Sequence, residues 1–310
     1  MNPKRQTFVR AVAGILVATA ALCTTAPVQA QNFNDLIEQL GVKELARDYL
    51  RPGVDAVGYS INSGYSHTAR VDTGFHVWIG AKLISTYIPD ADRSFVAILP
   101  DLMVSHGYPH SVQTATVVGG AGATIRSNDP STYPDIKLPD GTGLSTFVTA
   151  MPQISFGPLL GTDIILRGLP PSRFDDKIGK FSFYGAGIKH ELTHYLDIPF
   201  DLAVVAGYQT FTIGDVVDGN SLAGLLQASV FFSGVTAFGG LGYESYTIDV
   251  AYASVDPTSG NPVSIDLDFH RRNLRFAFGG AVSVLGLLDF TAEYSFGIQD
   301  NLTLGIGLNI

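Results

Sequence analysis

From about residue 71 to the end of the chain, large apolar residues alternate with small or polar ones. The last segment shows the pattern most clearly, because every second residue from Leu302 to Ile310 is Leu or Ile. The positions between them hold Thr, Gly, Gly and Asn. Successive side chains of a β-strand point to opposite faces. The alternation therefore predicts a strand with one apolar face and one small or polar face.

Three preceding segments repeat this pattern, over residues 246–252, 274–283 and 289–298. Other candidate strands lie within residues 71–86, 94–99, 113–125, 144–149, 152–167, 180–192, 200–208 and 222–233. Turn-rich stretches such as residues 129–141 separate these segments. We expect an all-β fold of about twelve strands, within a range of about 10–14.

Residues 219–243 contain no charged side chain, and their length alone would allow one membrane-spanning helix. Six glycines, with Gln227 and Ser229 in the interior, argue against that helix. The alternation of apolar and polar residues also continues on the C-terminal side. We interpret the run as two strands joined by a short turn near residues 238–240.

The N-terminal part of the chain has a different period. Apolar residues recur every three or four positions over residues 32–50, which indicates a helix. We expect Gly41 to break this helix into two pieces and Pro52-Gly53 to end it.

Residues 1–30 have the features of a secretory signal peptide. Lys4, Arg5 and Arg10 precede a twelve-residue apolar run, and Val28-Gln29-Ala30 has the form of a cleavage site. We therefore expect export, with cleavage after Ala30. This divides the chain into a signal peptide (1–30), a helical segment that either plugs a barrel lumen or stays in the periplasm (31–66), and a barrel (67–310).

Composition decides between the possible all-β architectures. The mean hydropathy is +0.23 and the chain has 34 glycines, while only 15% of its residues are charged. In a soluble sandwich the polar face should be rich in Lys, Glu and Arg, but here it holds mainly Gly, Ser, Thr, Ala and Asn. A transmembrane antiparallel β-barrel needs the observed combination, with bulky apolar residues toward lipid and small or polar residues toward the lumen. A soluble, lipocalin-like barrel is the alternative.

Charge and cysteine content exclude other classes. The net charge is −9, and the expected leader carries three cations and no carboxylate. Such an acidic protein is poorly suited to bind nucleic acid. The only cysteine lies within the leader, so disulfides have no part in the mature protein.

Several short motifs resemble a known group of proteins. They are Tyr49-Leu50-Arg51-Pro52, Asn62-Ser63-Gly64-Tyr65 and Tyr184-Gly185-Ala186-Gly187-Ile188-Lys189, followed by the closing amphipathic strands. Together they resemble an uncharacterised family of bacterial outer-membrane β-barrels and, more loosely, the long-chain fatty-acid transporters of the FadL type. The resemblance implies a location in the outer membrane, contact with its lipid and with the barrel-insertion machinery, and passage of small hydrophobic molecules. Such barrels usually end in an aromatic residue, whereas this chain ends in Ile310.

His190-Glu191-Leu192-Thr193-His194 matches the zinc-protease pattern H-E-x-x-H. Zinc binding by this motif requires a helix, which places the two histidines on one face. In a strand the two histidines would lie about 13 Å apart, too far to share one ion. We keep a zinc metalloprotease as a minor alternative and otherwise expect no enzyme, no metal and no cofactor.

The alternation assigns four charged residues of the last strands to the lumen, and we expect Asp249, Arg275, Asp289 and Glu293 to line any pathway. It places Tyr246, Ile248 and Val250 on the opposite, lipid-facing side. The expected function is passage of small hydrophobic molecules. A structural or adhesive barrel without transport is the alternative.

Overall fold

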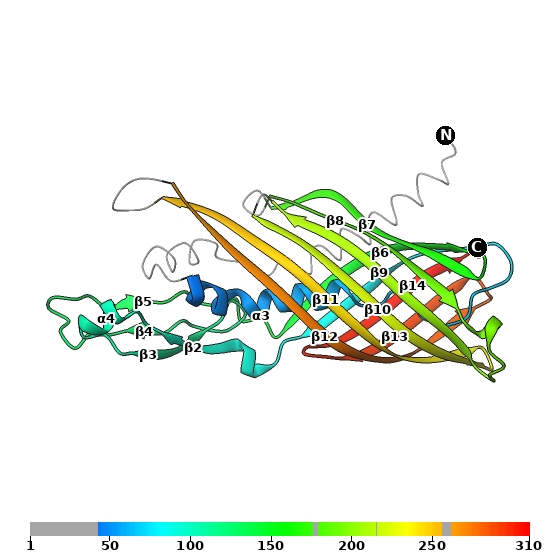
Figure 1. The fold of residues 1–310 in the computed structure, drawn as a ribbon, viewed down its shortest axis with the longest axis horizontal. Helices are drawn as coiled ribbons and strands as arrows, with labels where there is room; N and C mark the ends of the chain where they lie inside the picture. Colours follow the sequence, from blue (N-terminus) through cyan, green and yellow to red (C-terminus); the bar gives the residue numbers. More distant parts are fainter. Residues whose placement is uncertain (1–42, 176–178, 215, 256–261) are drawn as a thin grey trace.

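The computed structural model describes residues 43–175, 179–214, 216–255 and 262–310. Its main feature is a closed antiparallel barrel of ten strands (Figure 1). The first three barrel strands in the sequence are β1 (His76–Tyr87), β6 (Thr146–Gly157) and β7 (Thr162–Asp175). The others are β8 (Gly179–Glu191), β9 (Asp201–Ile213), β10 (Val217–Phe232), β11 (Val235–Val255), β12 (Pro262–Val284), β13 (Leu288–Phe296) and β14 (Asp300–Asn309). Among the described residues, no helix combines the length and apolar character that crossing a membrane requires.

The all-β prediction is confirmed, with a strand number at the lower end of the expected range. Two predicted strands do not join the barrel. Residues Ser94–Ile98 (β2) pair only with Ser111–Ala115 (β3), and Thr124–Ile125 (β4) pair with Ile136–Lys137 (β5). Period-two alternation specifies a strand but not its partner, and five residues are about half of what a membrane-spanning strand needs.

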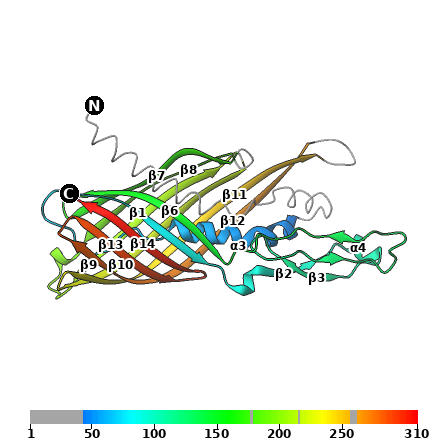
Figure 2. The same cartoon turned by 180° about the vertical axis from the view of Figure 1, so that it is seen from behind.

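These short strands belong to an insertion between β1 and β6, residues 88–145, which we call the extension. It also contains η1 (Asp90–Arg93) and α4 (Asp101–Ser105) and projects from one end of the barrel (Figures 1 and 2). We call this the extended end. The opposite, C-terminal end holds the beginning of β1 and the last residue, since Val77 and Ile310 exchange backbone hydrogen bonds.

Helix α3 (Lys43–Ile61) lies inside the half of the barrel next to the extension (Figure 2). The prediction that Pro52-Gly53 ends the helix is wrong, because the helix continues for nine residues beyond Pro52. A proline inside a helix costs roughly 3 kcal/mol. Here Pro52 is buried, and packing of α3 against the inner wall offsets that cost. Residues 1–42, with the expected signal peptide and the first helical piece, lie outside the described residues.

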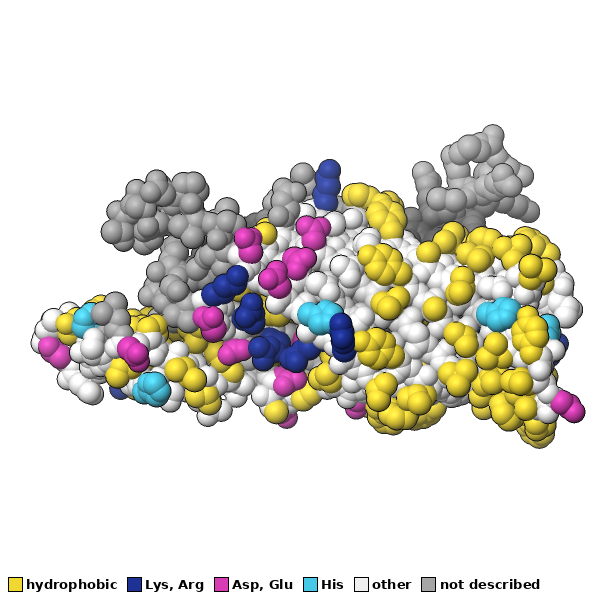
Figure 3. Space-filling view, in the orientation of Figure 1, with side chains coloured by type: hydrophobic (Ala, Val, Ile, Leu, Met, Phe, Trp, Pro, Cys, Tyr) yellow, Lys and Arg dark blue, Asp and Glu magenta, His cyan; other side chains and the backbone are white. Residues whose placement is uncertain are grey.

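Strands β11 and β12 change character along their length. Toward the C-terminal end their outer face is apolar, with Leu274, Phe276 and Phe278 each more than half exposed. Toward the extended end the same face carries polar and charged residues, namely Thr247, Asp249, Asp268, His270 and Arg272. Figure 3 shows this change as a group of charged side chains beside an apolar half.

The inner face of the same two strands is polar toward the C-terminal end and apolar toward the extended end. Tyr246, Ile248 and Val250 are buried in a core with residues of α3, which corrects the prediction that they face outward. The register between β11 and β12 is continuous, so neither strand turns over. A two-residue period shows that a strand has two different faces but does not show which of them lies inside the barrel. Here the apolar face lies inside because it covers the apolar surface of α3.

The uncharged run 219–243 forms two strands, as predicted, but the turn lies at Ser233-Gly234 instead of residues 238–240. Both turn residues have positive φ, at 49° and 86°. This is the conformation of the two-residue turn that suits the twist of a hairpin. Gly240 lies within β11, where a Cβ would come 2.7 Å from the carbonyl oxygen of Leu226.

Candidate functional site

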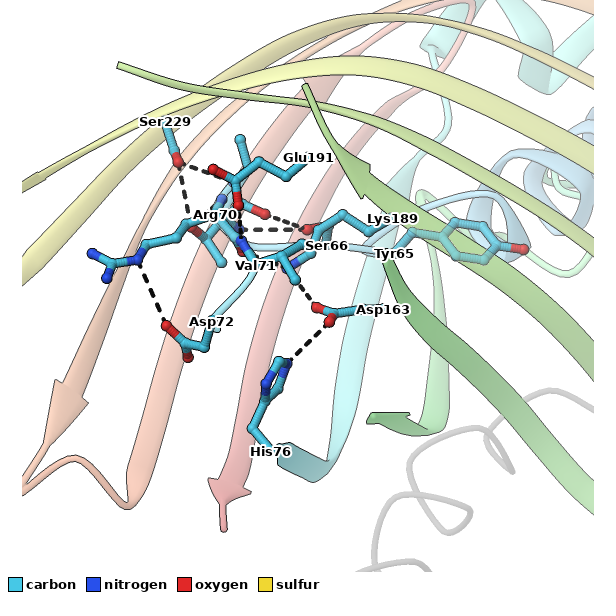
Figure 4. A network of polar contacts seen from close by, with 12 residues as sticks. Tyr65, Ser66, Arg70, Val71, Asp72, His76, Asp163, Lys189, Glu191 and Ser229 are labelled. Carbon is cyan, nitrogen blue, oxygen red and sulfur yellow. Dashed lines mark hydrogen bonds and ion pairs between the residues drawn. The ribbon is translucent and has the colours of Figure 1, made fainter. Parts of the chain in front are cut away.

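The barrel lumen is filled by the chain that follows α3. Residues 62–75, which we call the lumen segment, run through the lumen to the start of β1 (Figure 4). The segment has no regular secondary structure, so side chains of the wall bind its backbone. Gln153 donates to the Tyr65 carbonyl at 3.2 Å, and Lys189 donates to the Arg70 carbonyl at 2.8 Å. The wall thereby supplies partners that a buried irregular segment would otherwise lack.

The same segment also donates to the wall. The Ala69 amide donates to Ser229 Oγ at 2.9 Å, and the Val71 amide donates to Glu191 Oε2 at 2.7 Å. The Gly64 amide donates to Glu293, at a position where φ is +68°. These contacts come from four barrel strands, β6, β8, β10 and β13. The lumen segment is therefore hydrogen-bonded to several parts of the inner wall.

Buried charges surround the middle of the lumen segment. Arg275 and Glu244 form an ion pair of 2.8 Å, and the Arg275 guanidinium also donates to Ser295 Oγ. The Arg167 guanidinium lies 3.7 Å from the centre of the Tyr65 ring. Lys82 donates to Thr291 Oγ1 at 2.9 Å. Such groups are tolerated in the interior only when they are paired or hydrogen-bonded.

A second polar cluster lies at the C-terminal end (Figure 4). The Asp163 carboxylate lies 3.0 Å from His76 Nε2 and 2.9 Å from Lys189 Nζ, at ion-pair distance from both. His76 begins β1, Asp163 lies on β7 and Lys189 lies on β8. The cluster therefore ties the first barrel strand to two others at the point where the lumen segment ends.

The H-E-x-x-H motif contributes to this cluster and does not form one helix. His190 and Glu191 close strand β8, and His194 lies in the short helix η2 (Thr193–Tyr195). Glu191 binds the Val71 amide, and the His190 ring bonds to Thr162 Oγ1 at 2.8 Å. Among the described residues, no group of three potential ligands is arranged to hold a metal ion. Within the motif, Glu191 is the residue that contacts the lumen segment.

The structure places three of the four expected lumen residues on the inner wall, where Arg275, Asp289 and Glu293 are buried. Asp249 lies on the outer face of β11 and is exposed, which corrects that assignment. It belongs to the half of the strand where the polar face turns outward. Sequence reasoning missed Lys82, Arg167 and Lys189 on the inner wall. Their signal was a cation that directly follows an apolar residue of its strand.

Outside the lumen segment, α3 carries one buried acid. Asp55 accepts a hydrogen bond from the Tyr246 hydroxyl and lies 3.4 Å from the Arg271 guanidinium. Burial raises the pKa of the Asp55 carboxyl, and the contacts with Tyr246 and Arg271 oppose that rise. These contacts fix the helix against β11 and β12.

Strands β6 and β7 share the shortest ladder of the described barrel, and we call their junction the seam. Their ladder holds only four residue pairs, from Gln153–Arg167 to Phe156–Ile164. Toward the extended end the ladder stops where β6 reaches Pro152 and β7 continues to Pro170 and Pro171. Proline has no backbone N–H to donate to a ladder, so the regular β6–β7 pairing does not continue past these residues. On its other side β6 is paired with β1 over its whole length, and β7 is paired with β8 with register shifts between Leu169 and Ser172 and between Arg173 and Asp175.

The interior behind this seam is apolar. Met151 of β6 and Phe183 of β8 are buried in the core that surrounds α3, and Leu169 of β7 packs against it. Val54 and Val57 face them from the helix. The lumen thus has two parts, an apolar half around α3 and a polar half around the lumen segment.

Comparisons with solved structures find membrane β-barrels at low similarity. The attachment invasion locus protein Ail of Yersinia pestis is 11% identical, with a TM-score of 0.26 over 76% of this chain and 97% of that chain. The translocator domain of autotransporter NalP from Neisseria meningitidis is 14% identical, with a TM-score of 0.32 over 85% and 99%. The toluene transporter TbuX of Ralstonia pickettii is 8% identical, with a TM-score of 0.21 over 77% and 90%. At these scores the fold assignment rests on the barrel itself.

A comparison with curated proteins finds no match. A protein-family model matches residues 9–310, which is almost the whole chain. The chain therefore belongs to a family of unknown function, DUF6588.

Proposed function

We propose that the protein is an outer-membrane β-barrel that passes small hydrophobic molecules. The outer surface supports the membrane location, since each of the ten strands exposes large aliphatic or aromatic residues. Examples are Ile79, Ile154, Leu166, Ile188, Val204, Leu226, Leu241, Phe276, Phe290 and Leu304. Closure of the barrel satisfies the backbone groups that lipid could not.

The height of the apolar surface agrees with this location. On β12 the outward apolar residues run from Leu274 to Val284. At about 3.3 Å per residue and a strand tilt of roughly 40°, this stretch covers about 25 Å, the height of the apolar band of outer-membrane barrels. The longest connection between barrel strands, residues 88–145, lies at the extended end, as long extracellular loops do, so we assign the extension to the cell exterior.

The seam between β6 and β7 is the observation that carries the proposed passage. The lumen segment fills the polar half, so a straight path through the barrel is closed. The β6–β7 ladder ends at Arg167, and the next residue, Gly168, pairs on its other side with Tyr184, an exposed aromatic at the edge of the apolar surface. An apolar molecule could therefore move between the core around α3 and the edge of the lipid without crossing the polar half.

Cross-linking the seam tests this route. The mature chain has no cysteine, so the pair Ala150→Cys/Pro170→Cys provides the only thiols. Continuing the β6–β7 register places these residues opposite each other. We expect proteoliposomes to take up an apolar fluorescent solute, and a short bifunctional thiol reagent to stop that uptake.

The matched control is the pair Ala206→Cys/Gly224→Cys, which lies opposite across the closed β9–β10 ladder. Cross-linking there should leave uptake unchanged. Undiminished uptake after cross-linking the seam would exclude this route. Absence of uptake by the unmodified protein would favour a barrel without transport.

An adhesive role is the second candidate, because the extension exposes apolar residues to solvent. Val96 and Ile98 on one face of β2 are 60% and 63% exposed. If this face binds another surface, Val96→Ser/Ile98→Ser should reduce adhesion of cells that display the protein and leave solute uptake intact. Unchanged adhesion would remove this candidate.

A further inference from the structure

A cavity of about 320 Å³ lies at the C-terminal end of the lumen. It is bounded on one side by the lumen segment and on the other by strands β9 to β14. Its lining includes His67, Arg70, Asp201, Thr236, Asp289 and Asn309. It is remote from the seam, because it lies in the polar half of the barrel. Its volume is at the lower end of the range for small-molecule sites, roughly 300–1,000 Å³.

The cavity is lined by one carboxylate that is almost completely buried. Asp289 on β13 is only 6% exposed and lines the cavity. Within the described part of the chain it makes neither a hydrogen bond nor an ion pair. Lys82 is near enough to interact electrostatically, but its ammonium binds Thr291 and lies 5.1 Å from the centre of the Trp78 ring. A buried charge in this position needs a counter-ion.

The other walls also favour a positive ligand. Asp72 and Asp201 add two carboxylates, against the single guanidinium of Arg70, which pairs with Asp72 at 3.6 Å. Thr236 and Ser283 provide neutral hydroxyls that can accept hydrogen bonds. Phe231 adds an aromatic side chain to the lining, a surface for an apolar body or a cation.

We propose that this cavity binds a small organic ammonium ion, with Asp289 as its counter-ion. The ammonium would lie against the Asp289 carboxylate, and the organic body would lie toward Phe231. The site is independent of the proposed passage, because its residues belong to the opposite end of the lumen.

Trp78 provides a built-in reporter for this site. It is the only tryptophan of the chain, and its ring lies 5.7 Å from that of His67, centre to centre. His67 lines the cavity, so a bound ligand should change the fluorescence of Trp78. The probe is benzylammonium, titrated into the full-length mature protein in detergent at constant ionic strength. Benzyl alcohol, of nearly the same shape, and benzoate serve as the neutral and anionic comparisons.

We expect saturable binding of benzylammonium and none of benzyl alcohol or benzoate at the same concentrations. Asp289→Asn should weaken benzylammonium binding by about tenfold or more, because it removes a charge-assisted hydrogen bond. Asp249→Asn, the same change on the outer face, should leave the affinity unaltered.

The fold of each variant is checked by its heat-dependent mobility on a denaturing gel. If Asp289→Asn fails this check, Thr236→Val removes a cavity hydroxyl and keeps the charges; it should weaken binding by a smaller factor. Equal binding of benzylammonium and benzyl alcohol, no saturable signal from the native protein, or full affinity in a folded Asp289→Asn variant would each overturn the proposal.

Discussion

At the scale of the residue, the interior of this barrel depends on charged and polar side chains that the alternation pattern identifies only in part. Arg275, Asp289 and Glu293 could be assigned to the inner wall from their positions in the strands. Asp249 could not, because the strand half that carries it covers an apolar helix. The residues that bind the lumen segment, such as Gln153 and Lys189, could not be identified because their partners are backbone atoms of a distant segment.

The buried Arg275–Glu244 pair gives a test at this scale. Arg275→Leu leaves the Glu244 carboxylate without its main partner, so we expect a loss of roughly 3–5 kcal/mol in the free energy of unfolding. Urea titration of the detergent-solubilised protein measures it. The double variant Arg275→Leu/Glu244→Gln should recover part of that loss, because it removes the unpaired charge. A single variant as stable as the native protein would show that the pair does not stabilise the fold.

At the scale of the element, strands of the C-terminal half follow the sequence pattern closely, whereas α3 and the extension do not. The predicted strands over 180–192 and 289–298 correspond to β8 and β13 within a few residues. Helix α3 passes through Pro52 because its surroundings are apolar, which is information about packing that local sequence lacks. The strands of the extension have the period of barrel strands but only half their length.

Close packing of α3 against the wall leads to a prediction for Gly58. A Cβ at this position would lie 2.4 Å from the Tyr246 ring, so Gly58→Ala forces the helix and β11 apart. We expect a destabilisation of about 1–3 kcal/mol, typical of overpacking. Gly224→Ala on β10 is the control, since a Cβ there has no neighbour within 4 Å. Equal stability of the two variants in urea would show that α3 is not packed against β11 as described.

At the scale of the whole molecule, the barrel consists of two zones stacked along its axis. One zone exposes apolar residues and encloses a polar lumen, and the other exposes polar residues and encloses an apolar helix. The first zone is suited to lipid and the second to water. This arrangement accounts for a high mean hydropathy in a chain whose exposed charged side chains gather in one half of the barrel surface (Figure 3).

The boundary between these zones is the central claim, and accessibility along the outer face of β12 tests it most directly. Single cysteines at positions 268, 270, 272, 274, 276 and 278 would each carry a spin label in lipid vesicles. We predict that labels at 268–272 collide mainly with a water-soluble nickel chelate and that labels at 274–278 collide mainly with oxygen dissolved in lipid. Equal exposure to the chelate at all six positions would contradict a membrane-spanning barrel.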